Sequence, residues 1–173
     1  MKITLVGYMG SGKTSIGEML SKQLNLDFYD LDSLIVEKEK DSIYNLFKKK
    51  GELYFRKMEH IMLKKILKNK NKYVLSLGGG TPCFYNNIDL VNQYSKTFYL
   101  KMDSFTLLKR LFLEKKTRPL ISHLSKNELF IFIIKHLSKR IYFYEKSHKN
   151  IYIGEKSKND IVKEIIYNGK GKN

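Results

Sequence analysis

The stretch of the chain that most directly indicates chemistry is residues 7–14, which read GYMGSGKT and match the pattern GxxxxGK[ST]. The glycines let consecutive backbone N–H groups curl around a phosphate, and the start of a helix adds positive potential there. Lys13 is expected to reach the β- and γ-phosphates of a nucleoside triphosphate, and the Thr14 hydroxyl is expected to bind Mg²⁺. An apolar segment precedes the pattern and a helical pattern follows it. We therefore interpret residues 7–14 as a nucleoside-triphosphate site.

Two carboxylates stand two residues apart in FYDLD, residues 28–32. Hydrolases with this kind of loop carry an Asp after an apolar strand, but here the candidate strand at residues 73–77 runs into glycines. Because the carboxyl ends of parallel strands face the ligand crevice, Asp30 and Asp32 can both reach it. We expect Asp30 near the metal, through water, and Asp32 to accept or orient the proton of an attacking hydroxyl. The alternative is that both aspartates only cap a helix beginning at Ser33.

Three consecutive glycines follow at residues 78–80, in a chain that contains only 11. Glycine supplies either a positive φ or room where a side chain would block a close approach. Because the glycines end an apolar strand, we expect another group to approach the backbone closely here.

Basic residues outnumber acidic ones by 33 to 17, which gives a net charge of +16. The lysines are spread along the chain, so we interpret the charge as a solvated surface, with nucleic-acid binding as the alternative. In such a lysine-rich chain, an arginine indicates a position that needs a planar fork for a carboxylate or a phosphate. The four arginines are Arg56, Arg110, Arg118 and Arg140.

Short apolar segments alternate with helical patterns, which is typical of a parallel sheet covered by helices on both faces. The expected strands are residues 3–6, 28–29, 73–77, 98–100 and 151–153. The expected helices include residues 15–24, 59–67, 105–113 and 160–167. The apolar run at residues 129–134 is expected to be a buried helix segment, and the tail at residues 168–173 is expected to be frayed.

Length and composition fit one domain over residues 1–173 with 42% hydrophobic residues. The longest apolar run is too short to cross a membrane, and the apolar start is too short for a secretory signal. A single cysteine, Cys83, fits a reducing compartment, so the cytoplasm is expected. We expect a monomer with no nucleic-acid and no membrane partner. The four histidines match no metal-binding spacing and are expected at the surface or in a lid.

Taken together, GYMGSGKT, FYDLD, FRKME, LGGG, TRPL and RIYFY resemble the shikimate kinase family from residue 3 to about residue 153. The resemblance implies an α/β P-loop kinase fold, a three-layer sandwich with a five-stranded parallel sheet. It implies a substrate-binding insertion at residues 33–60 and a lid at residues 111–125. The implied reaction transfers the γ-phosphate of ATP to the 3-hydroxyl of shikimate, with Mg²⁺, and gives shikimate 3-phosphate and ADP. This is a step of chorismate and aromatic amino-acid biosynthesis.

The resemblance also implies roles for individual residues. Asp32 and Lys13 are implied as catalytic, Thr14 and Asp30 as the metal site, and Arg110 as a neighbour of the adenine. The residues implied to hold ATP are Gly10, Ser11, Gly12, Lys13, Thr14 and Ser15, with Arg118 of the lid above the phosphates. The residues implied to hold shikimate are Asp32, Arg56, Gly79 and Arg140. The chain departs from the family pattern in TPCF after the glycines and in RIYFY, which lacks a proline after the arginine.

The chemistry of shikimate agrees with these residues. Arg56 and Arg140 suit its carboxylate, and Asp32 suits a hydroxyl. The ring is expected to pack against bare glycine backbone, where a Cβ would intrude. Glu59 is expected to hold Arg56 in place, or else to form an exposed ion pair. A related kinase for gluconate or a nucleoside monophosphate and a non-catalytic nucleic-acid-binding protein are the competing hypotheses.

Overall fold

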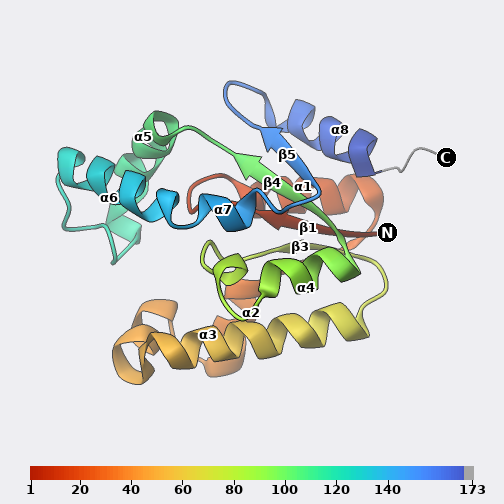
Figure 1. Cartoon of the computed structure of the whole chain (residues 1–173), viewed down its shortest axis with the longest axis horizontal. Coiled ribbons are helices and arrows are strands. Elements are labelled where there is room, and N and C mark those ends of the chain that lie inside the picture. Colours follow the sequence, from red (N-terminus) through yellow and green to blue (C-terminus); the bar gives the residue numbers. More distant parts are fainter. Residues whose placement is uncertain (170–173) are drawn as a thin grey trace.

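The centre of the fold is a parallel sheet in the strand order β2-β3-β1-β4-β5, shown for the computed structural model in Figure 1. The strands are β1 (Lys2–Val6), β2 (Asp27–Asp30), β3 (Tyr73–Ser76), β4 (Lys96–Lys101) and β5 (Lys149–Tyr152). The structure describes residues 1–169. All five expected strands are present, so the predicted five-stranded parallel sheet is confirmed.

The register of the strands brings the ends of the first three to one edge. Leu5 of β1 pairs with Ser76 of β3, and Asp30 of β2 pairs with the same serine. The three segments that follow these strands therefore start side by side. They are the loop with the phosphate pattern, the helix that follows Asp30, and the three glycines, so the edge is where a ligand crevice is expected.

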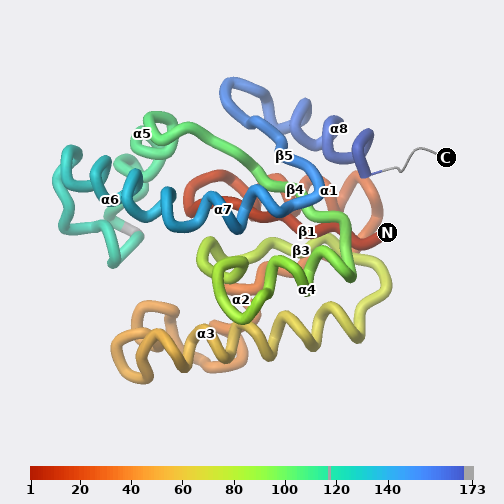
Figure 2. The backbone as a smooth tube through the Cα atoms, viewed as in Figure 1, coloured from red at the N-terminus to blue at the C-terminus, as the bar shows by residue number. Residues whose placement is uncertain are grey.

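Helices cover both faces of the sheet because the connections that leave its central strands run in opposite directions across it. From β1 it passes through α1 (Lys13–Leu24) to β2, and from β3 through α4 (Asn87–Tyr94) to β4. Right-handed crossovers in opposite directions place their helices on opposite faces. Accordingly, α1 packs with α8 (Lys158–Gly169), and α4 packs with the long helix α3 (Ile43–Asn69), as the chain path in Figure 2 shows.

The central strands are buried as this arrangement requires: β3 is buried at all four positions and β1 at four of five. At the other end of the chain, α8 continues through Asn168 and Gly169, two residues expected in the frayed tail. The rest of that expected tail, residues 170–173, lies outside the described residues. None of the described helices is long and apolar enough to cross a membrane.

The apolar run at residues 129–134 forms part of α6 (Lys126–Ser138), which packs against α5 (Ser104–Glu114). The prediction of a helix is confirmed, but the prediction of a buried segment holds for only two of its six residues. Leu129 and Ile133 are buried, whereas Ile131 and Ile134 are about half exposed. The reason is the helical period: residues four apart share the face that reaches the core, and the others point away from it.

The insertion expected at residues 33–60 consists of α2 (Leu31–Glu39) and the first half of α3. Gly51, at φ 80° and ψ 168°, breaks the helical geometry inside α3, and glycine adopts this conformation readily. The segment before this kink, residues 43–50, lies beside the carboxyl edge of the sheet and contributes side chains to the smaller of the two cavities described below.

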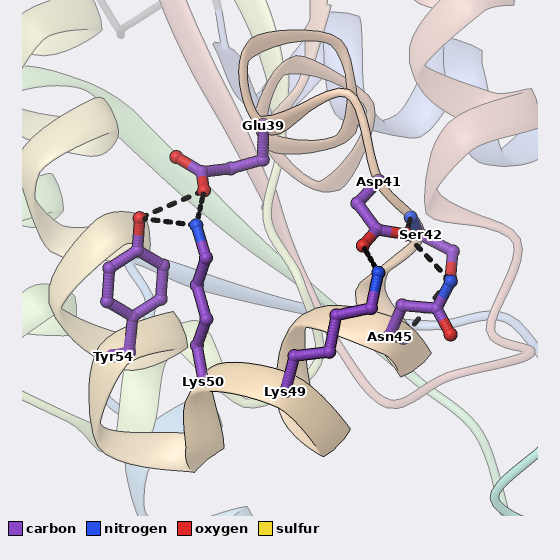
Figure 3. Close-up of polar contacts among 7 residues, drawn as sticks. All are labelled: Glu39, Asp41, Ser42, Asn45, Lys49, Lys50 and Tyr54. Carbon is purple, nitrogen blue, oxygen red and sulfur yellow. Dashed lines mark hydrogen bonds and ion pairs between the residues drawn. The ribbon is translucent and has the colours of Figure 1, made fainter.

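Two polar clusters fasten residues 43–50 to the end of α2 (Figure 3). Glu39 accepts hydrogen bonds from Lys50, at 2.7 Å, and from Tyr54, at 2.9 Å. Asp41 accepts from Lys49, at 2.6 Å, and from Asn45, at 2.7 Å. Because Asp41 reaches both Asn45 and Lys49, and Glu39 reaches Lys50, the segment is held along its length despite the kink that follows it.

Candidate active site

The loop after β1 has the backbone geometry that a phosphate site requires. Gly10 and Gly12 have φ values of 78° and 88°, in the left-handed region that favours glycine. Lys13 Nζ crosses the loop and donates to the carbonyls of Gly7, at 2.8 Å, and Tyr8, at 2.9 Å. These two bonds hold the ammonium group at the mouth of the loop. The structure therefore brings together the loop residues and Lys13 as the sequence predicted.

Burial lowers the pKa of Lys13 to about 8, and the carboxylates of Asp32 and Asp30 oppose that effect. The ammonium group is consequently still mostly charged at pH 7. A cation that has already lost most of its water interacts strongly with a phosphate, because little further desolvation is needed.

Asp30 has two roles, one on each carboxylate oxygen. Oδ1 accepts from the backbone N–H of Ser33, at 3.2 Å, and caps α2, while Oδ2 accepts from the Thr14 hydroxyl, at 2.8 Å. Asp30 therefore does cap the helix, as the alternative interpretation expected, although the helix begins at Leu31 and not at Ser33. That interpretation is wrong for Asp32, which lies inside the first turn and leaves its carboxylate for other contacts.

The first cavity encloses about 500 Å³ above the loop. Its polar lining combines the loop with both aspartates and three cationic side chains. The residues that carry these groups are Lys13, Thr14, Ser15, Asp30, Asp32, Arg110, Arg118 and Lys158. Such a space, with cations around a phosphate loop, fits the triphosphate of a nucleotide.

Two arginines above the loop differ in how they are held. Arg110 Nη1 donates to the carbonyl of Gly10, at 3.4 Å, which places it against the loop. Arg118 follows the short 3₁₀ turn η2 (Lys115–Thr117) and pairs with the Glu114 carboxylate, at 2.8 Å. The Arg118–Glu114 pair is largely exposed and therefore weak, so Arg118 is free to exchange this partner for a phosphate.

A second, smaller cavity of about 140 Å³ adjoins the first. All four residues predicted to hold shikimate line it, namely Asp32, Arg56, Gly79 and Arg140. Its apolar walls come from Ile43, Phe47, Phe55 and Leu120. Asp32 and Gly79 line both cavities, together with Met9. The two spaces therefore meet at Asp32, where a group in the smaller cavity can face a phosphate in the larger one.

Arg56 is the most firmly held cation of the site. Its Nη1 donates to Glu59, at 2.6 Å, and the other oxygen of Glu59 accepts from the Thr81 hydroxyl, at 2.5 Å. The guanidinium lies over the ring of Phe84, 4.5 Å from the ring centre. Only 1% of Glu59 is exposed, so the exposed-pair alternative is wrong and Glu59 positions Arg56. The unusual segment TPCF supplies both Thr81 and Phe84.

The sequence predicted that the three glycines leave room for a bound ring, but two of them leave room for side chains of the protein itself. A Cβ at Gly80 would lie 2.6 Å from the Arg56 guanidinium, and one at Gly78 would lie 2.6 Å from Asp32 Oδ1. None of the three has a positive φ. Two of the glycines thus make room for side chains of the site itself. All three line the cavity, and a Cβ at Gly79 would be the least crowded of the three, at 3.4 Å from its nearest neighbours.

Asp32 is an unusually basic carboxylate. Burial raises its pKa to about 6, and the neighbouring carboxylates of Glu59 and Asp30 act in the same direction. Lys13 and Arg56 limit the rise by favouring the charged form. At pH 7 the group is mostly ionised yet has a much higher affinity for a proton than an ordinary aspartate, which suits a proton acceptor.

Three side chains at or near the smaller cavity were not singled out by the sequence. Tyr144 donates from Oη to the carbonyl of Gly79, at 2.5 Å, and so supports the glycine backbone from below. His136 lines the cavity and is bonded to Tyr8, at 3.0 Å. The expectation that all histidines lie at the surface or in a lid is wrong for His136, because its helix turns this side toward the sheet. Only tertiary packing reveals this.

A phosphate loop at the carboxyl edge of a parallel sheet, with a small cavity lined by two arginines beside it, defines a P-loop kinase that acts on a small molecule. A family model described as shikimate kinase matches residues 9–168. The chain belongs to the shikimate kinase family. The predicted fold class and the predicted class of enzyme, an ATP-dependent kinase, are confirmed with it.

Individual relatives support this assignment. The chain is similar to a shikimate kinase of Flavobacterium psychrophilum, with 46% identity over 95% of this chain and 96% of that protein. Its structure is similar to a shikimate kinase of Bacteroides thetaiotaomicron, with a TM-score of 0.89 and 33% identity over 96% and 97% of the two chains. It is also similar to a shikimate kinase of Acinetobacter baumannii solved in complex with shikimate, with a TM-score of 0.84 and 29% identity over 99% and 95% of the two chains.

The raised pKa of Asp32 has a consequence for stability. Its folded pKa of about 6 lies above the ordinary 3.8, so its stabilising contribution is complete below about pH 4 and is lost as the pH rises through 6. Asp32→Asn removes the buried charge. We expect its free energy of unfolding at pH 8 to exceed that of the parent by about 1–3 kcal/mol, and the two to agree near pH 4. Urea denaturation at both pH values measures this difference.

The matched control is Asp27→Asn, which changes an exposed aspartate on the neighbouring strand. It is expected to shift stability by less than about 0.5 kcal/mol at either pH. A less stable Asp32→Asn protein at pH 8 would contradict the account of a carboxylate whose charge is costly in the fold.

Proposed function

We propose that the two cavities hold ATP and shikimate side by side, and that Asp32 receives the proton of the 3-hydroxyl as the γ-phosphate is transferred. The observation that carries this proposal is the position of Asp32 and Gly79, which line both cavities. The products are shikimate 3-phosphate and ADP. Positioning supplies most of the catalysis in phosphoryl transfer, so a shared wall between two binding sites suits this reaction.

On the nucleotide side, Gly10, Ser11, Gly12 and Ser15 are proposed to surround the phosphates, with Lys13 toward the β- and γ-phosphates. Ser11 Oγ is buried without a hydrogen-bond partner among residues 1–169, which is the state expected of a group that serves a ligand. Arg118 is proposed to leave Glu114 and to close over the phosphates as part of a lid at residues 111–125. Closing it excludes water, which otherwise competes as an acceptor. Arg110 borders the same space, and we propose that it lies near the adenine.

Thr14 and Asp30 are proposed to hold Mg²⁺, with Asp30 acting through water. Their oxygens lie 2.8 Å apart at the edge of the nucleotide cavity, and hard oxygen donors are what this cation requires. No group of three acidic, histidine or cysteine side chains within residues 1–169 could form a protein cage for a metal. This donor set fits Mg²⁺, which keeps several waters and binds phosphates directly. When bound, the ion neutralises charge on the phosphates.

On the acceptor side, Arg56 and Arg140 are proposed to bind the carboxylate of shikimate. Arg56 is pre-positioned by Glu59, and Arg140 stands at the start of α7 (Ile141–Tyr144), 6.0 Å from the centre of the Tyr8 ring. Hydrogen bonds to a charged group contribute about 1.5–3 kcal/mol each, which is enough to favour an acid over a neutral polyol. Gly79 offers bare backbone to the ring.

Residues 33–60 are proposed to act as the substrate-binding insertion, because Ile43 and Phe47 reach the smaller cavity from this segment. We further propose that the enzyme acts as a monomer in the cytoplasm, without nucleic-acid or membrane partners.

The reaction is tested by coupling ADP release to added acceptor. We expect the purified protein with ATP and Mg²⁺ to release ADP in proportion to shikimate, and not with gluconate or nucleoside monophosphates.

Asp32→Asn should bind ATP with an unchanged Kd but lower kcat by about 10²–10⁴-fold, because it removes the proton acceptor. Asp27→Asn, at the exposed start of β2 and away from the carboxyl edge of the sheet, serves as the control with normal kcat. Turnover of another acceptor in place of shikimate, or near-normal kcat in Asp32→Asn, would overturn the proposal.

Arg140→Lys tests the carboxylate site separately. Lysine keeps the charge but cannot form a two-pronged contact, so we expect KM for shikimate to rise about tenfold or more while KM for ATP stays within twofold. Steady-state kinetics with each substrate varied gives both constants. Lys139→Arg, the reverse exchange at the adjacent exposed position, should leave both unchanged. If KM for shikimate does not change in Arg140→Lys, Arg140 lies outside the contact.

A further inference from the structure

His136 is a side chain of the acceptor cavity for which the proposed function gives no role. It lies on α6 one helical turn before Arg140 and lines the smaller cavity together with Arg56 and Arg140. It comes from the helix that follows the lid region, whereas Arg56 comes from α3 on the opposite wall. A ligand carboxylate between the two arginines therefore has the His136 ring beside it.

The contact with Tyr8 determines which ring nitrogen of His136 carries the proton. Tyr8 is 2% exposed, and its Oη lies 3.0 Å from His136 Nδ1. The rings meet edge to face, with 5.7 Å between their centres. Within residues 1–169, Oη has no other hydrogen-bond partner, and a buried phenol must donate its proton. Because Nδ1 is the only acceptor for this proton among residues 1–169, we infer that it carries no proton and that the proton of the neutral ring is on Nε2.

The electrostatic surroundings keep the ring neutral. The charged groups that act on it are Arg140, Arg56 and Lys139, against one carboxylate, that of Glu52. Burial and these cations lower the pKa of His136 to about 4. A neutral ring adds a donor to the cavity without adding a third positive charge. Nε2 has no partner among the described residues, and it is not enclosed by protein.

We propose that His136 is a specificity-determining residue that donates a hydrogen bond from Nε2 to the carboxylate of the acceptor, between the two arginines. Tyr8 is the positioning residue that holds the ring in this tautomer. The inference rests on the proposed function, since it assigns a third donor to the same carboxylate. It also links the two sites, because Tyr8 belongs to the phosphate loop and its carbonyl accepts from Lys13.

The kinetic test compares substrates with and without the carboxylate. His136→Leu is expected to raise KM for shikimate about tenfold, the effect of one hydrogen bond to a charged group, with kcat and KM for ATP within twofold. For the analogue in which the carboxylate is reduced to a hydroxymethyl group, kcat/KM should change less than twofold. His136→Gln, which keeps an N–H donor, should recover part of the loss. Lys135→Gln, an exposed neighbour on α6, is the control.

Equal losses for shikimate and the hydroxymethyl analogue would overturn the inference, because a purely structural role affects both alike. So would an unchanged KM for shikimate in His136→Leu. A parent enzyme that does not phosphorylate shikimate would defeat the proposed function instead, and that outcome is visible before any variant is made.

A second measurement needs no turnover. Nitrogen chemical shifts of ¹⁵N-histidine at pH 7 distinguish the two tautomers of His136 in the folded protein. We expect the Nε2–H form in the parent and a mixture of both forms in Tyr8→Phe, which keeps the ring but lacks the hydroxyl. The Nδ1–H form in the parent, or an unchanged tautomer in Tyr8→Phe, would contradict the role of Tyr8.

Discussion

The organisation of this site depends on the buried ion pair between Arg56 and Glu59. Removing one partner of a buried ion pair costs about 3–5 kcal/mol, because the other charge is left buried without full compensation. Thr81 completes the network by donating to the second oxygen of Glu59. The pair can lie under the end of β3 only because Gly80 and Gly78 leave the space for it. The space left by the glycines and the pairing of the two charges are therefore both needed to hold Arg56 in place. The position of Arg56 in turn determines where a carboxylate ligand can bind.

The parallel sheet explains why this pair is close to a nucleotide. β1, β2 and β3 end in register, so the phosphate loop, the two aspartates and the glycines occupy one edge. Burying ionisable groups at that edge has a cost, which is visible in the raised pKa of Asp32 and the lowered pKa of Lys13. Both shifts bring proton affinities closer to neutral pH, as proton transfer at pH 7 requires.

The parts of the structure that could be predicted from sequence are those with local causes. Alternating apolar segments indicated the five strands, and the GxxxxGK[ST] spacing indicated the loop, because each depends on neighbouring residues alone. The position of Asp32 and Asp30 followed from a rule about strand ends. The family resemblance added Arg56 and Arg140, which no spacing in the chain connects, since 84 positions separate them. By contrast, the room that Gly80 makes for Arg56 and the contact of His136 with Tyr8 arise only when α3, α6 and the loop pack together.

The most direct test of the central claim, one crevice shared by a nucleotide and a carboxylate-bearing ring, is a crystal structure of the protein with ADP, Mg²⁺ and shikimate. The account predicts the shikimate carboxylate between Arg56 and Arg140, the ring against Gly79, and the 3-hydroxyl within hydrogen-bond distance of Asp32. Shikimate bound away from Asp32, with the nucleotide in the phosphate loop, would contradict it.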